Sequence, residues 1–262
     1  GFSQSEGIVL SGSVSQANVF GSGRFVSVNL NTSKINRAIG LSYTNPYFTV
    51  DGISQGFDVY HRKSDPQSLD YAYKTESTGG GIRFGIPIDE KQTVNFGLAI
   101  DHTKVEIDPT DSDTPYQYKR FNQEFCGNGS SIPDTCSNVT FPATIGWVSD
   151  SKDSAINPRS GAFQRANLEW ALPGGDLTYY KLTYQHQRFF PVTRTMTLML
   201  NGELGYAKGR SGQEVPFYKN FYAGGPSSVR GYEAASLGPY EMSGGDPVRL
   251  GGTKKVIFNS EL

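Results

Sequence analysis

The sequence lacks the features that identify several protein classes. No stretch approaches the 18 or so consecutive apolar residues of a transmembrane helix, which excludes that kind of membrane protein. Neither charge is in surplus, because 24 Lys and Arg balance 25 Asp and Glu, so nothing indicates nucleic-acid binding. The three histidines, His61, His102 and His186, are scattered on separate segments. We therefore predict no metal site and no cofactor.

Cysteine is also scarce. Cys126 and Cys136 are the two present, and they flank the nine residues GNGSSIPDT. A short segment with glycine and proline permits a local disulfide, which implies an oxidising compartment. The spacing fits no zinc pattern. We predict the disulfide, with two free thiols as the alternative.

What the sequence has in quantity is glycine and aromatic residues, with 31 Gly, 15 Tyr and 16 Phe. Aromatic residues suit pleated sheets, and glycine supplies turns. In VNFGLAID (94–101), apolar residues alternate with polar or small ones, which is the period of a strand with one apolar face. About eleven such strands are predicted and no helix of useful length. Their ranges are roughly 8–17, 24–31, 37–44, 53–63, 75–87, 94–101, 139–149, 165–172, 178–189, 195–206 and 252–262.

The lengths of the connections separate two all-β architectures. Short links alternate with a second set that includes the long segments 105–138 and 209–250. Membrane barrels have short turns at one end and longer loops at the other, whereas a soluble sandwich more often distributes its long loops between both ends. Strands of about ten residues also match a tilted bilayer crossing. We therefore predict an all-β, transmembrane antiparallel β-barrel, with the soluble sandwich as the alternative.

In such a barrel the apolar faces contact lipid, and the other faces line a lumen. A lumen this polar contains water or a plug. Aromatic residues near strand ends would form interfacial girdles; these are Tyr43, Tyr47, Phe48, Tyr60, Phe84, Trp147, Trp170, Phe189 and Phe190. The predicted inward residues are Asp101, Arg165, Glu169, Lys181, Glu203 and Glu261, beside Gly85, Gly97 and Gly205.

One segment carries a recognisable motif. YKNFYAGGPSSVRGYEAASLGP (218–239) resembles the loop-six motif of the BamA family, the central barrels of the outer-membrane protein assembly machinery. TNPYFTVDG (44–52) and the G-x-P-I turn (85–88) resemble the same family. The core Val229, Arg230, Gly231 and Tyr232 is shared with the wider POTRA-barrel polypeptide-transport superfamily, which includes two-partner secretion pores and organelle import barrels.

The resemblance implies an organisation for the chain. Family members carry periplasmic POTRA repeats followed by a sixteen-stranded barrel. Laid on that pattern, residues 1–262 are one partial barrel domain, with 105–138 and 209–250 as external loops. Gly1–Ser3 would be the end of strand one, and 252–262 most of strand twelve. The POTRA repeats and the last four strands are then absent from the sequence. The implied location is the outer membrane of a Gram-negative bacterium.

The resemblance also implies a site. In the family, loop six folds back into the lumen, and the arginine at its tip pairs with acidic residues of the inner wall. Here the arginine is Arg230 and the matching acid is Glu261, while a second acid lies beyond this sequence. The alternative is that Arg230 is an ordinary solvated loop residue. We expect loop-six support from Phe221, Tyr222, Gly224 and Gly225, since glycine permits close backbone approach.

The implied function is assembly of other outer-membrane β-barrels through a weak lateral seam, without covalent catalysis. The expected partners are unfolded outer-membrane proteins, membrane lipids and accessory lipoproteins, and not nucleic acid. The alternatives are a polypeptide-secretion pore of the two-partner type and a passive porin. GISQG (52–56) fits the serine-hydrolase string, but it leads from a turn into a strand rather than into a helix, so we predict no enzyme and no catalytic residue.

Overall fold

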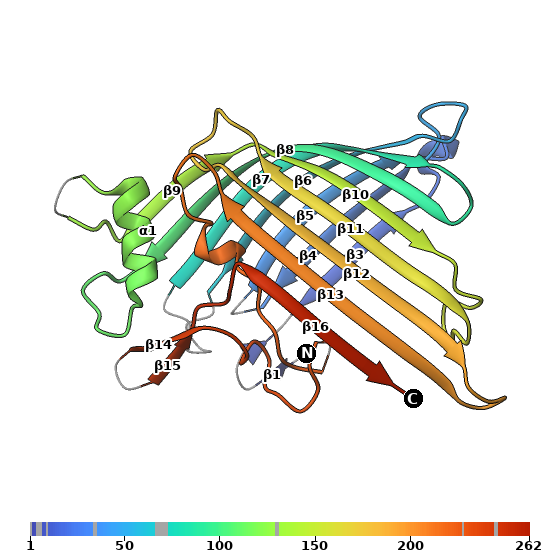
Figure 1. Ribbon diagram of the computed structural model, residues 1–262. Coiled ribbons are helices and arrows are strands. Elements are labelled where there is room, and N and C mark those ends of the chain that lie inside the picture. Colours follow the sequence, from blue (N-terminus) through green and yellow to red (C-terminus); the bar gives the residue numbers. More distant parts are fainter. Residues whose placement is uncertain are drawn as a thin grey trace.

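A single curved antiparallel sheet dominates the computed structural model of the chain (Figure 1). The structure describes residues 2–3, 7–8, 10–33, 36–65, 73–128, 131–226, 228–243 and 246–262. The sheet has twelve strands in the order β16-β13-β12-β11-β10-β8-β7-β6-β5-β4-β3, and β9 pairs with β8 beside β10. Neighbours along the chain are therefore neighbours in the sheet, as in a barrel wall.

The strands follow the predicted ranges closely. β9 and β10 act as one interrupted strand, because β9 pairs with 101–106 of β8 and β10 with 92–98. The sheet strands are β3 (Ser11–Gln16), β4 (Phe25–Thr32), β5 (Asn36–Asn45), β6 (Ser54–Ser64), β7 (Tyr73–Pro87), β8 (Gln92–Ile107), β9 (Thr135–Thr140), β10 (Pro142–Asp150), β11 (Gly161–Ala171), β12 (Tyr179–Pro191), β13 (Thr197–Gly209) and β16 (Lys254–Glu261). Outside this sheet, β1 (Phe2–Ser3) pairs with β2 (Gly7–Ile8), while Gly1 lies outside the described residues.

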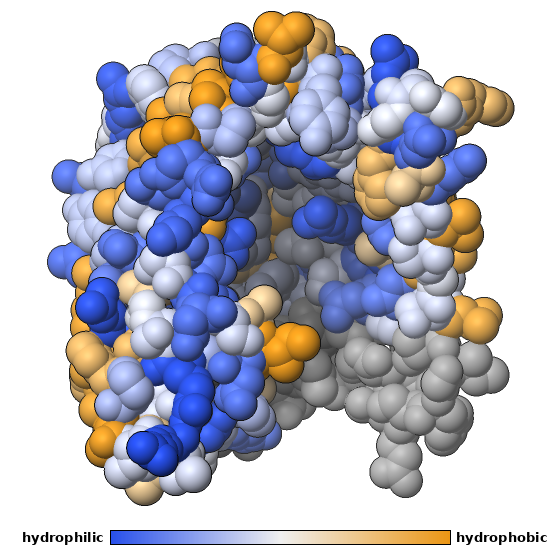
Figure 2. Space-filling model, turned by 90° about the vertical axis from the view of Figure 1, so that its right-hand side faces the viewer, coloured by the Kyte–Doolittle hydropathy of each residue, from blue (hydrophilic) through white to orange (hydrophobic). Residues whose placement is uncertain are grey.

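The two faces of the sheet differ as predicted. On β8 the side chains of Phe96, Leu98 and Ile100 are exposed, whereas a side chain at Gly97 would meet Thr144 of the neighbouring β10. From the end where the short turns lie, hydrophilic residues line a hollow and hydrophobic residues follow the outer margins (Figure 2). The prediction of a membrane-barrel wall, rather than a sandwich with a buried apolar layer, is confirmed. Among the described residues, no helix is long and apolar enough to cross a membrane.

Two girdle predictions are wrong, those for Phe189 and Tyr60. Phe189 of β12 pairs with Met199, which pairs with Glu261 of the inner wall, so Phe189 shares the inner face. Tyr60 does not face outward, because its hydroxyl oxygen occupies the place where a side chain at Gly79 would point. It lines a pocket of about 380 Å³ together with Asp101 and Lys219. Strand alternation gives the reason, since its neighbour Val59 is exposed on the outer face. Tyr60 therefore belongs to the inner wall.

The prediction that no useful helix exists is also wrong. The segment 105–138 contains α1 (Tyr116–Cys126), with Tyr118, Phe121 and Asn122 buried. These positions recur at the three- and four-residue spacing of one helix face. The first turn lacks a side-chain cap of its own, but the backbone N–H of Tyr116 donates to the Glu241 carboxylate at 3.0 and 3.2 Å. A residue distant in sequence thus completes the helix start.

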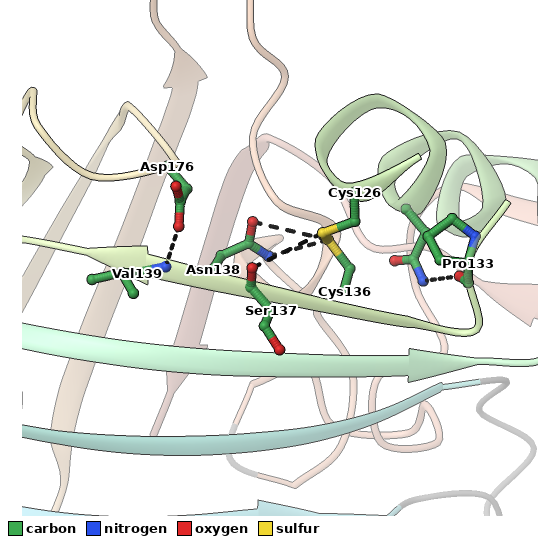
Figure 3. Close-up of a disulfide and its surroundings, with 8 residues drawn as sticks. Cys126, Pro133, Cys136, Ser137, Asn138, Val139 and Asp176 are labelled. Carbon is green, nitrogen blue, oxygen red and sulfur yellow. Dashed lines mark hydrogen bonds between the residues drawn. A yellow bond between two sulfur atoms is a disulfide. The ribbon is translucent and has the colours of Figure 1, made fainter. Parts of the chain in front are cut away.

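A disulfide connects α1 to β9 (Figure 3). Cys126, at the end of α1, is bonded to Cys136 with their Cα atoms 5.4 Å apart, as predicted. Nearby, Asn122 donates from its side-chain amide to the carbonyl of Pro133 at 2.8 Å. The backbone N–H of Val139 donates to Asp176 at 2.6 Å, which joins β9 to the β11–β12 connection. The disulfide therefore joins α1 to β9, and the Val139 hydrogen bond joins β9 to the connection between two further strands of the sheet.

The segment between β13 and β16 passes along the concave side of the sheet (Figure 1). It contains the 3-10 helix η3 (Phe217–Lys219) and a hairpin of β14 (Tyr240–Ser243) and β15 (Asp246–Arg249). A second 3-10 turn, η1 (Val19–Gly21), lies in the β3–β4 connection. The described part of the predicted loop 209–250 thus contains regular secondary structure, and its last residues lead directly into β16.

Candidate functional site on the inner wall

We define the loop segment as residues 210–253, the connection from β13 to β16. Its first anchor is aromatic. Phe217 is buried and stacks on Tyr118 of α1 with ring centroids 4.2 Å apart. The edges of Tyr73 and Phe121 approach the same ring, at 4.9 and 5.4 Å. Aromatic pairs in such geometries each add about 0.5–1.5 kcal/mol beyond burial. The loop segment is therefore packed against α1 and the end of β7.

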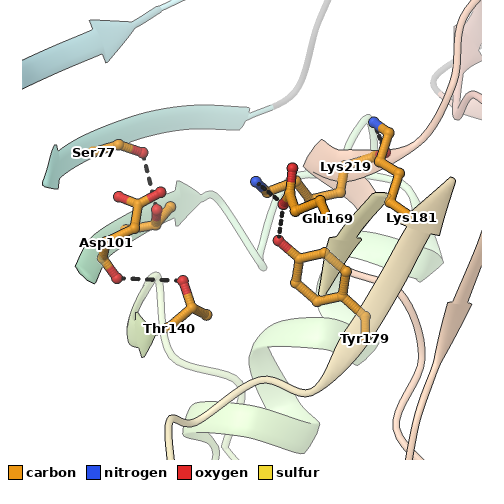
Figure 4. Close-up of polar contacts among 8 residues, drawn as sticks. Ser77, Asp101, Thr140, Glu169, Tyr179, Lys181 and Lys219 are labelled. Carbon is orange, nitrogen blue, oxygen red and sulfur yellow. Dashed lines mark hydrogen bonds and ion pairs between the residues drawn. The ribbon is translucent and has the colours of Figure 1, made fainter. Parts of the chain in front are cut away.

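The second anchor is an ion pair next to that cluster (Figure 4). The Lys219 ammonium lies 2.8 Å from Oε1 of Glu169 on β11, and Tyr179 of β12 donates its hydroxyl proton to the same oxygen at 2.6 Å. The Lys181 ammonium donates to the Lys219 carbonyl at 2.7 Å. Burial alone would lower the pKa of Lys219, but the Glu169 carboxylate outweighs this and raises it above the ordinary 10.5. The Lys219 side chain is therefore held as a cation.

The third anchor is an aromatic ring seated on a glycine. A Cβ atom at Gly205 of β13 would lie 2.9 Å from Cζ of Phe221, so the absent side chain makes room for the ring. The Lys181 ammonium lies 4.4 Å from the centroid of the same ring, within cation–π range. Phe221 also exchanges backbone hydrogen bonds with Gly252, at 2.8 and 2.9 Å. This contact brings the start and the end of the loop segment together.

Beyond Phe221 the backbone folds tightly on itself. Gly224 and Gly225 have φ values of +114° and +90°, a region that favours glycine. A side chain at Gly224 would collide with the carbonyl oxygen of Glu233 at 2.3 Å. The N–H of Gly225 donates to the carbonyl of Tyr232 at 3.0 Å, and the Tyr222 hydroxyl donates to the carbonyl of Leu250 at 3.4 Å. The two glycines therefore permit a compact tip.

At the tip, the structure places Arg230 against β16. Nη2 of Arg230 lies 3.2 Å from Oε2 of Glu261, and Asn259 donates from its side-chain amide to the carbonyl of Ser228 at 2.7 Å. The side chains of Arg230 and Glu261 remain 71% and 39% exposed, so the pair is well solvated. Such pairs contribute at most about 1 kcal/mol to folding stability. This contact therefore orients the loop tip more than it stabilises the fold.

Comparison with known proteins adds the family. Residues 18–262 match the Omp85 superfamily domain. The chain belongs to the Omp85 superfamily. It is 40% identical over 268 aligned residues to the outer membrane protein assembly factor BamA of Neisseria meningitidis, covering all of this chain and 33% of that protein. It is 26% identical to BamA of Nitratidesulfovibrio vulgaris, covering 96% of this chain and 30% of that one.

A solved structure agrees with the fold of this Omp85 chain. The crystal structure of BamA from Haemophilus ducreyi lacking POTRA domains 1–3 superposes with a TM-score of 0.86 at 25% identity, over 97% of this chain and 50% of that one. The Omp85 chain spans about a third of the length of the two curated BamA relatives named above. The barrel-type sheet and these relatives place it in the outer membrane of a Gram-negative bacterium, as a multi-pass β-barrel protein.

Other residues that were predicted to line the lumen form polar contacts in this Omp85 chain. Glu203 of β13 pairs with Lys255 of β16 at 2.8 Å. Lys181 and Glu169 meet around Lys219, a residue that was not predicted to take part although it lies two positions before Phe221 in the motif. Alternation of side chains assigned Glu169 to the lumen, but alternation does not indicate which loop residue reaches it.

The serine-hydrolase string GISQG (52–56) leads into a strand. Ser54, the serine of GISQG, lies at the start of β6, and its hydroxyl donates to the carbonyl of Gly85 at 3.3 Å, so no strand-to-helix elbow is present there. Among the described residues, no group of three or more His, Cys, Asp or Glu side chains is arranged to hold a metal ion.

Proposed function

We propose that the chain is the barrel portion of a factor that folds other β-barrel proteins and inserts them into the outer membrane, without forming covalent intermediates. The observation that carries the proposal is the loop segment fastened along the inner wall, with Arg230 of the Val-Arg-Gly-Tyr motif beside Glu261. The similarity to two proteins named assembly factor BamA supports it. In the proposed topology, α1 lies at the external end of the strands, and the loop segment starts and ends there.

The anchors suggest what the loop segment contributes. Phe217 contacts α1, Lys219 contacts β11, Phe221 contacts β13 and Arg230 contacts β16. Because the loop segment is attached at four places, it resists changes in the curvature of the strands beneath it. We infer that this part of the barrel stays rigid, so that opening is concentrated at a weakly paired seam elsewhere. The exposed edge of an open seam would pair with an incoming strand by β-augmentation.

The proposal includes partners and a non-enzymatic role. The substrates would be unfolded outer-membrane proteins, and accessory outer-membrane lipoproteins would bind the same machine. Backbone pairing at a strand edge needs no nucleophile, because hydrogen bonds and burial in lipid supply the driving force. A short apolar belt near the seam would also thin the bilayer and lower the barrier to insertion.

Depletion of the protein in its own bacterium tests the proposal. If the protein is a general assembly factor, the amounts of several unrelated outer-membrane barrels fall together in the outer-membrane proteome. Loss of a single exported polypeptide would instead favour a two-partner secretion pore. Unchanged barrels together with lost solute uptake would favour a porin. Either of the last two outcomes would overturn the assembly role.

A further inference from the structure

The outer face of the sheet carries a second feature, at the loop end of β11, β12 and β13. A pocket of about 680 Å³ is lined there by Leu168, Trp170, Tyr180, Lys208 and Arg210. Its volume lies within the range of small-molecule sites, about 300–1,000 Å³. We propose that this surface, with the adjacent Lys254, binds the phosphorylated head group of an outer-leaflet glycolipid. The inference rests on the proposed topology, in which this end of the strands is external.

The register shows that these side chains share one face. Trp170 pairs with Tyr180, and Tyr180 pairs with Lys208, so the three residues form one row across the strands. Two residues before Lys208 on β13, Tyr206 pairs with Lys254 of β16. The rings of Tyr180 and Tyr206 lie 6.0 Å apart. Directly opposite residues on antiparallel strands project to the same side, which brings Lys254 to the edge of the row.

Arg210 is held over the row by its backbone. Its N–H donates to the carbonyl of Thr178 at 2.9 Å, and its carbonyl accepts from the N–H of Gln213 at 3.1 Å. The next two residues bend the chain, with φ values of +58° at Ser211 and +85° at Gly212. The guanidinium carbon lies 5.7 Å from the centroid of the Trp170 ring. The backbone of Arg210 and its contact with Trp170 thus place the cation over the aromatic row.

The charges favour an anion. Lys208, Arg210 and Lys254 form none of the ion pairs found among the described residues, whereas Lys63 of β6 pairs with Glu76 at 3.6 Å and Lys74 of β7 with Asp65 at 3.3 Å. Three cations on one outward surface repel each other unless an external anion lies between them. Phosphate groups are the anions present at a lipid surface, and Arg matches their geometry with two parallel donors.

The surface continues into apolar residues, which favours a lipid over a soluble anion. Leu182 and Leu204 are exposed on the same outward face. Leu182 pairs with Tyr206, the residue opposite Lys254, and Leu204 lies two residues before Tyr206 on β13. An aromatic row between cations and aliphatic side chains matches the boundary between head groups and acyl chains. Lys and Arg near a membrane surface each attract anionic lipid by about 1 kcal/mol. One amphiphile with phosphates and acyl chains satisfies both parts.

Binding of a defined glycolipid tests this inference. The full-length protein in detergent is titrated with bisphosphorylated lipid A and observed by native mass spectrometry. The test variant combines Lys208→Gln, Arg210→Gln and Lys254→Gln; the control combines Lys63→Gln, Lys74→Gln and Lys104→Gln, which removes three cations from β6, β7 and β8. We expect the test variant to bind at least about tenfold more weakly and the control to bind like the parent.

Further arms separate the possible ligands. Dephosphorylated lipid A should also bind at least about tenfold more weakly than the phosphorylated form. Equal binding of the parent and the test variant overturns the site, and so does equally tight binding of phosphatidylethanolamine. Inorganic phosphate that competes at the concentration of the glycolipid would indicate a soluble-anion site instead and overturn the lipid assignment. Unchanged heat-modifiability of both variants verifies folding. Depletion that lowers other barrels, together with unaltered lipid binding in the test variant, would remove this inference while leaving the assembly role intact.

Discussion

Gly205 and Gly202 lie on the same strand, β13, in opposite environments. A side chain at Gly205 meets the Phe221 ring, whereas nothing lies within 4 Å of the Cβ position at Gly202. We predict that Gly205→Ala displaces the ring and destabilises the loop segment by about 1–3 kcal/mol, the usual cost of overpacking. Limited proteolysis of residues 210–253 measures the effect, with Gly202→Ala as control. Equal cleavage rates in the two variants would contradict the role of this contact.

Arg230 is expected to orient the loop tip rather than to stabilise the fold. Because its pair with Glu261 is largely solvated, Arg230→Ala should change the unfolding free energy by less than about 1 kcal/mol. We nevertheless expect faster proteolysis at the loop tip and poorer barrel assembly, because the guanidinium orients the tip. Arg230→Lys should restore assembly only in part. Arg194→Ala, in an exposed short turn, is the matched control. A variant with the parent's loop protection and heat-modifiability would refute the pairing as a positioning contact.

At the scale of elements, α1 depends on tertiary contacts rather than on its own sequence. Its start is capped by Glu241, its apolar face packs on Phe217, and its end is bonded through Cys126 to β9. We predict that Cys126→Ser with Cys136→Ser destabilises α1 by about 2–3 kcal/mol of lost chain constraint, while the sheet remains intact. Hydrogen exchange compares the two regions. Unaltered protection of α1 would show that packing alone holds it.

The link between the loop segment and β11 should depend on pH. The raised pKa of Lys219 means that the pair with Glu169 stabilises the fold fully below 10.5 and is lost as pH rises through the higher folded-state pKa. The apparent melting temperature should therefore fall more steeply above pH 10.5 in the parent than in Lys219→Arg, since arginine stays charged throughout this range. Parallel melting curves for the two proteins between pH 9 and 12 would contradict this prediction.

For the whole molecule, the ends of the sheet matter most. Among the described strands, β3 and β16 each have one neighbour, so each has an edge of unpaired backbone groups. Unpaired groups are costly in hydrocarbon, and spanning sheets close for that reason. We predict that a polypeptide of residues 1–262 alone does not refold in detergent into a heat-modifiable species, whereas the full-length protein does. A stable, heat-modifiable band from the short polypeptide would show that these strands close by themselves.

Much of this architecture is specified locally. A strand presents alternate residues to opposite faces, so the order of apolar and polar residues along 94–101 or 195–206 sufficed to predict one lipid face and one inner face. Turn residues and connection lengths then separated a barrel from a sandwich. The same rule assigned Glu169, Lys181 and Glu203 to the lumen, because it needs no knowledge of any partner.

Partners across the fold depend on how distant segments come together, which no local pattern encodes. The helix α1 went unpredicted because the residue that caps it, Glu241, and the ring on which it packs, Phe217, come from distant parts of the chain. Lys219 meets Glu169, and Phe221 fills the space above Gly205, only because the loop segment returns along the concave wall. Residue order therefore specifies faces and turns, whose physics is short-range, while long-range packing selects which side chains touch.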